Sequence, residues 1–166
     1  MRKTPAWQLY GHCFAALWLL FHAQTSLAQN QVGAGELAPQ FSSITLEKDC
    51  FGCAGGVKLV LLREGSATRT ALGQARLGTI DQQRTSPLSS TDFDALLRVI
   101  LEQDFLSLQS IYEEPDLRDG DWINITLAGP GVEKTVFQRA QAGPPALQAI
   151  AAAIAHLEAQ LFKTAH

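Results

Sequence analysis

One amphipathic segment decides how this chain folds: residues 91–101, which read TDFDALLRVIL. Its large apolar side chains fall at positions i, i+3, i+4, i+7 and i+8, counted from Phe93. That spacing places them on one face of a helix. Thr91 and Asp94 have the spacing of a capping box at the start of the helix. We therefore predict a helix over Thr91–Gln103 whose apolar face packs against the rest of the fold.

A second apolar stripe near the C-terminus predicts another helix, over Pro145–Leu161. Proline is tolerated in the first turn of a helix, because the N–H that it lacks has no partner there. The residues of the stripe are Leu147, Ile150, Ala151, Ile154, Leu157 and Leu161. Polar side chains, among them His156 and Glu158, interrupt this helix too often for it to span a membrane.

Runs of alternating or continuous apolar residues predict the strands. Ile44 and Leu46 alternate with polar neighbours, which is typical of a half-buried strand. Further strands are predicted over 57–62, 68–72, 76–81, 123–127 and 132–139, with a polar loop over 82–90 and a buried turn or short helix over 105–112. Two groups of strands, each followed by a helix, favour the α+β class. We predict an antiparallel sheet of about five or more strands with two amphipathic helices packed on one face.

The N-terminal residues predict export. Arg2 and Lys3 precede a short apolar run, 13–21, and the small residues Ser26 and Ala28 suit a cleavage site after Ala28. This run is roughly half of the ~20 apolar residues that a membrane span needs. We expect a signal peptide over 1–28, a disordered linker over 29–40 and a single α+β domain over 41–166. The mature protein is then periplasmic or secreted, with no membrane span after signal cleavage.

Charge and motif content narrow the partners. The 166 residues include 13 basic and 16 acidic side chains, a net charge of −3, with no basic block. This balance argues against nucleic acid as a partner. Glycine-rich phosphate-binding motifs do not occur, so no cofactor is predicted. The expected partner is an unknown protein or a small ligand of the cell envelope.

Cys50 and Cys53 are the cysteines that remain after cleavage. A pair in an oxidising compartment usually forms a disulfide. Exchange enzymes place such a pair at a helix N-terminus, which stabilises the thiolate, but here Gly55, Gly56 and a predicted strand follow. A structural disulfide or a free pair is therefore favoured, with thiol–disulfide exchange and metal binding as alternatives.

Carboxylates gather between residues 113 and 121, and Asp116, Asp119 and Asp121 are weak calcium candidates. Their spacing does not match the EF-hand order, and acid-rich loops are usually solvated, so no metal site is assigned. No catalytic residue is assigned either, because G-x-S-x-G does not occur and His156 is the one histidine expected in an ordered element.

The order of several short motifs resembles that of an uncharacterised bacterial exported family, domain of unknown function 6438. Its members typically show Cys-Phe-Gly-x-Cys-Pro before a strand, then a glycine turn, then a helix ending in an Asp-Phe-Phe-x-Leu-like run. The matching residues are Cys50, Phe51, Gly52, Cys53, Gly65, Asp104, Phe105, Leu106, Leu108, Pro145 and Leu147. The resemblance implies export and a similar fold, and it implies no activity.

Two functions remain open. The first is a non-enzymatic exported binding or interaction module that uses the cysteine loop and the neighbouring sheet surface. The second is an envelope thiol–disulfide redox protein that uses Cys50 and Cys53. The lack of convergent catalytic residues in the sequence favours the binding module over an enzyme.

Overall fold

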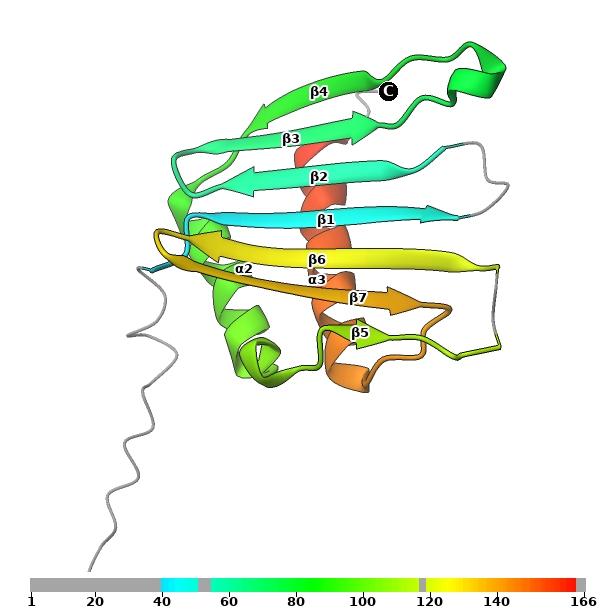
Figure 1. The fold of residues 1–166 in the computed structure, drawn as a ribbon. Helices are drawn as coiled ribbons and strands as arrows, with labels where there is room; N and C mark the ends of the chain where they lie inside the picture. The colour runs from blue at the N-terminus through cyan, green and yellow to red at the C-terminus, as the bar shows by residue number, and fades with distance from the viewer. Residues whose placement is uncertain (1–39, 51–54, 117–118, 164–166) are drawn as a thin grey trace, which may run out of the picture. The chain divides into compact units, whose positions relative to one another are not determined.

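The strands form one sheet with the two long helices on one of its faces (Figure 1). The computed structural model describes residues 40–50, 55–116 and 119–163, all within one unit, Val32–His166. The elements are β1 (Ser43–Cys50), β2 (Val57–Leu62), β3 (Ser66–Ala71), η2 (Ala75–Leu77), β4 (Gln82–Pro87), α2 (Ser90–Glu102), η3 (Phe105–Ser107), β5 (Ile111–Tyr112), β6 (Asp121–Gly129), β7 (Val132–Arg139) and α3 (Pro145–Leu161). The predicted signal peptide, 1–28, lies outside the described residues. So does the predicted linker, 29–40, apart from Gln40.

The sheet has seven strands in the order β4-β3-β2-β1-β6-β7-β5. All neighbouring strands are antiparallel except β5, which pairs with β7 in parallel. β1 lies at the centre, where it pairs with β2 on one side and β6 on the other. The predicted α+β class, with a largely antiparallel sheet and helices on one face, is confirmed.

The core lies between the sheet and the two helices. Leu97 of α2 and Ile154 of α3 are fully buried, and so are Ile44 of β1 and Leu59 of β2. The buried positions of α2 are Phe93, Leu96, Leu97 and Ile100, which are four of the five residues of the predicted stripe. Burial of these stripes is the main stabilising contribution, because helical propensity alone is weak. None of the helices in the described part of the chain combines the length and the hydrophobicity of a membrane-spanning helix.

The start of α2 differs from the prediction. The N-cap is Ser89, whose side-chain Oγ accepts a hydrogen bond of 3.0 Å from the backbone N–H of Asp92. The predicted capping box of Thr91 and Asp94 is therefore wrong by two residues. Asp94 instead accepts from the guanidinium of Arg63 at the end of the β2 strand, 3.0 Å from Nε. Both serine and threonine suit a cap, so the choice between them depends on where the chain leaves β4.

Two predictions between residues 76 and 90 are wrong. Residues 76–81 do not form a strand. Arg76 and Leu77 belong to the short 3-10 helix η2, which ends at Gly78 in the left-handed conformation (φ 68°). The predicted loop at 82–90 contains β4 instead. β4 is an edge strand with mostly exposed side chains, so it lacks the apolar alternation from which strands are recognised.

The segment 105–112 holds both a short helix and a strand. After α2, Asp104 takes the left-handed conformation (φ 53°), which ends the helix, and η3 follows with Phe105 fully buried. Ile111 and Tyr112 then form β5 beside β7. The predicted buried turn or short helix is confirmed for Phe105, while the strand was missed because two residues carry no periodicity.

Candidate functional site

The predicted cysteine site lies at the end of β1. Cys50 is the last residue of this strand, and its backbone N–H donates to Oδ1 of Asp49 at 2.7 Å. Cys53, its predicted partner, lies outside the described residues, so that pairing stays a prediction. Asp121 sits opposite Cys50 in register. A strand end beside two carboxylates does not stabilise a thiolate, which argues against an exchange catalyst at this position.

A pocket of about 260 Å³ adjoins Cys50. Val57, Trp122 and Ile123 supply its apolar wall, and Asp49 and Asp121 supply carboxylates. Trp122 also packs against Phe137 on the sheet face away from the helices, with ring centroids 6.1 Å apart. This region therefore offers an aromatic surface next to negative charge.

The described residues of the acidic segment, 113–116 and 119–121, include the three calcium candidates. Asp116, Asp119 and Asp121 are all described, yet no group of three or more His, Cys, Asp or Glu side chains within the described ranges could hold a metal ion. Glu113 pairs instead with Arg139 of β7 at 3.6 Å. Asp121 begins β6, where its carbonyl accepts from the N–H of Ala140. The structure does not bring the three calcium candidates together.

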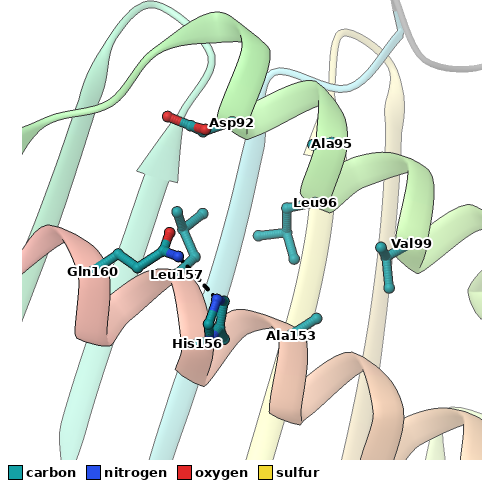
Figure 2. A pocket seen from close by; sticks show the side chains of 8 residues that line it. All are labelled: Asp92, Ala95, Leu96, Val99, Ala153, His156, Leu157 and Gln160. Atoms are coloured by element: carbon teal, nitrogen blue, oxygen red, sulfur yellow. Dashed lines mark hydrogen bonds between the residues drawn. The ribbon is translucent and has the colours of Figure 1, made fainter.

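His156 lies on the outer side of the helix layer, in a shallow groove of about 220 Å³ between α2 and α3 (Figure 2). Its Nε2 is 2.9 Å from Nε2 of Gln160, one helical turn later. The floor of the groove is apolar, with Leu96 and Val99 from α2 and Ala153 from α3. Asp92, the other ionisable group in the groove, binds the cap residue Ser89. This arrangement gives His156 a packing and hydrogen-bonding role.

A different pocket, of about 440 Å³, is lined by four charged side chains. It lies between the helix-facing side of the sheet and the C-terminal turns of α3. Lys48 comes from β1, Arg69 from β3, Arg84 from β4 and Glu158 from α3. We call it the basic pocket, because three cations share it with one carboxylate.

Glu158 organises the basic pocket. Its side chain is 11% exposed, and its two oxygens bind different cations. Oε1 accepts from Nε of Arg69 at 2.7 Å, and Oε2 lies 3.4 Å from Nζ of Lys48. A buried carboxylate needs such partners, because desolvation of an unpaired charge is costly. Glu158 therefore holds Arg69 through Nε of the guanidinium.

Arg84 adds a third cation next to Arg69. The two arginines are directly opposite each other in the register of β3 and β4, so both side chains are on the helix-facing side. Like charges at such positions repel each other. The guanidinium of Arg84 lies over the ring of Phe162, 6.0 Å from its centroid. With Glu158 neutralising one charge, the pocket keeps a formal charge of about +2, which suits an anion.

The basic pocket was missed in the sequence because its members are far apart in the chain. Lys48, Arg69 and Arg84 read as ordinary polar strand residues, and Glu158 reads as an interruption of the last helical stripe. One signal was present: Glu158 directly follows Leu157, at the edge of the apolar face, where a carboxylate becomes partly buried. The register that aligns Arg69 with Arg84 depends on β4, which the sequence pattern did not reveal.

Comparison with known proteins gives no indication of the function. The chain matches no family model and no curated protein. The resemblance to domain of unknown function 6438 therefore stays a prediction.

Proposed function

We propose that this protein is a non-enzymatic exported binding module whose ligand site is the basic pocket, and that the ligand is anionic. The observation that carries the proposal is the pairing of Arg69 and Arg84 on neighbouring strands. Glu158 is the one carboxylate among the described residues that line the same pocket. An anion between the two guanidinium groups would relieve their repulsion.

The chemistry of the pocket favours binding over acid–base catalysis. A guanidinium group donates hydrogen bonds and accepts none, so Arg69 and Arg84 are suited to binding the oxygen atoms of an anion. Planar guanidinium groups match the geometry of carboxylates and phosphates, to which they donate two parallel hydrogen bonds. A volume of about 440 Å³ lies in the range of small-molecule sites.

Titration calorimetry of the purified protein tests this proposal. The probes are succinate and inorganic phosphate, each compared with chloride at matched ionic strength, because salt alone screens surface charges. We expect saturable binding that is lost in Arg84→Gln and in Arg69→Gln. The matched control is Arg98→Gln, which removes an exposed arginine of α2 outside the pocket. If Arg84→Gln still binds succinate or phosphate as the wild type does, the anion site is refuted. It is also refuted if neither succinate nor phosphate gives more binding heat than chloride.

The proposal places the module in the periplasm or outside the cell, on the strength of Arg2, Lys3, the short apolar run and the small residues before position 29. Intact-mass measurement of the exported protein is then expected to begin at Gln29. A membrane-retained product that still begins at Met1 would contradict export with cleavage. The ligand is expected to be a protein segment or a small molecule of the envelope.

A further inference from the structure

The basic pocket opens beside a free strand edge. β4 is the outermost strand on its side of the sheet (Figure 1). Its six residues, QQRTSP, pair with β3 on one side, and no strand among the described residues pairs with the other. Such an edge presents unpaired backbone N–H and C=O groups, which can bind an additional extended chain.

The direction of the backbone groups of β4 follows from a neighbouring hydrogen bond. The N–H of Leu88 donates to the carbonyl of Gly65, in the turn before β3. In an antiparallel ladder every second residue points its backbone groups the same way. Ser86 and Arg84 therefore point their backbone groups towards β3, whereas Gln83 and Thr85 point theirs to the free edge. Pro87, which has no N–H, falls in the edge-facing set, as this pattern requires.

Side-chain register extends the charge of the pocket to this edge. One row of helix-facing residues crosses six strands in register: Val136, Ile125, Leu46, Leu59, Arg69 and Arg84. The row changes from apolar to cationic towards the edge. On a strand added beside β4, the residue opposite Arg84 would be the next member of the row.

We propose that the anionic ligand is an extended acidic peptide segment that adds as an antiparallel strand along β4 and places a carboxylate opposite Arg84. This inference rests on the anion binding proposed above. Charge complementarity selects the occupant, because the strand must supply an acidic side chain at the position next to Arg84. A second copy of β4 does not fit, since QQRTSP contains no acidic residue.

The backbone geometry makes a sharp test. Because the backbone of Arg84 faces β3, the peptide residue opposite Arg84 points its own N–H away from β4. The residues on either side of it point their N–H groups towards Gln83 and Thr85. The test uses a short synthetic peptide that alternates glutamate with threonine. With glutamate opposite Arg84, the backbone N–H groups of the threonines should donate hydrogen bonds to β4, and those of the glutamates should not.

Fluorescence anisotropy with three peptides tests this arrangement: the parent, one N-methylated on its threonine amides and one N-methylated on its glutamate amides. We expect threonine methylation to weaken binding about tenfold or more, because several hydrogen bonds are lost, and glutamate methylation to have little effect. Arg84→Gln should weaken all three. Thr85→Pro, which removes an edge-facing N–H and no ladder bond, should weaken the parent peptide and leave the succinate response intact.

The outcomes separate the two proposals. If both methylated peptides bind as tightly as the parent while succinate still binds, strand addition is wrong and the anion site stands. If the parent peptide binds Arg84→Gln as tightly as the wild type, strand addition next to Arg84 is also wrong. If the peptides, succinate and phosphate all fail to bind, the proposed function fails with it. The peptide comparison uses the unaltered protein, so it remains decisive if Thr85→Pro does not fold.

Discussion

Between the sheet and the helices, β1, β6 and β7 present leucine, isoleucine and valine, whereas β3 and β4 present arginine at the same row of the register. The apolar half of this layer is closed by α2 and the first turns of α3. The charged half lies against the last turns of α3, around Glu158. Both halves obey the same inward and outward alternation of strand residues. Burial alone explains the apolar side chains of the first half. It does not explain the charged side chains of the second half.

The largest expected effect is in the apolar half. Leu97→Ala and Ile154→Ala each remove a fully buried side chain, and each should lower the free energy of unfolding by about 2 to 5 kcal/mol. Arg98→Ala, on the exposed side of α2, should change it by less than about 0.5 kcal/mol. Denaturant midpoints of the three variants measure the contrast. Denaturant midpoints of both core variants that are close to that of the wild type would contradict the packing.

Cys50, at the end of β1, lies two residues beyond Lys48, which belongs to the charged half. We predict that Cys50 pairs with Cys53 and that the disulfide shapes the loop without turning over. The double variant Cys50→Ser with Cys53→Ser should lower the free energy of unfolding by about 2 kcal/mol, since the closed loop is short. The wild type should show no reductase or oxidase activity on a disulfide substrate. Measurable turnover, with a reduction potential of roughly −120 to −270 mV, would favour the redox function instead.

A smaller effect separates the two candidate caps of α2. Ser89→Ala removes the side chain that accepts from the N–H of Asp92 and should cost about 1 kcal/mol. Thr91→Ala changes an exposed position inside the first turn and should cost clearly less. Thermal unfolding of the two variants decides between them. A larger loss for Thr91→Ala would move the helix start to the position that the sequence pattern indicated.

Sequence reasoning succeeded where side-chain burial repeats with a regular period. Both helices and the strands of the central sheet were recognised in this way, because Ile44, Phe93 and Ile154 each belong to such a period. It failed at β4 and β5, where one strand is exposed and the other has two residues. The basic pocket was missed for the same reason, since Arg84 is assigned to a site only when β4 is known to be a strand.

The cysteine and acidic candidates show where sequence reasoning suggests a site that the described structure does not support. They are close in sequence and therefore conspicuous, yet Asp116, Asp119 and Asp121 do not converge on a cation site. The members of the basic pocket are up to 110 residues apart, as in the pair Lys48 and Glu158. Local motifs find groups that are neighbours along the chain, whereas a pocket under a sheet joins residues that only strand register brings together.

Thermal unfolding of the wild type and of Arg84→Gln at low ionic strength, with and without succinate, tests the central claim most directly. If Arg84 is held beside Arg69 for an anion, the repulsion lost in Arg84→Gln should at least offset the lost contact with Phe162, so the variant should be no less stable than the wild type when succinate is absent. Succinate should then stabilise the wild type and not the variant. A variant that is less stable than the wild type and is still stabilised by succinate would contradict the account.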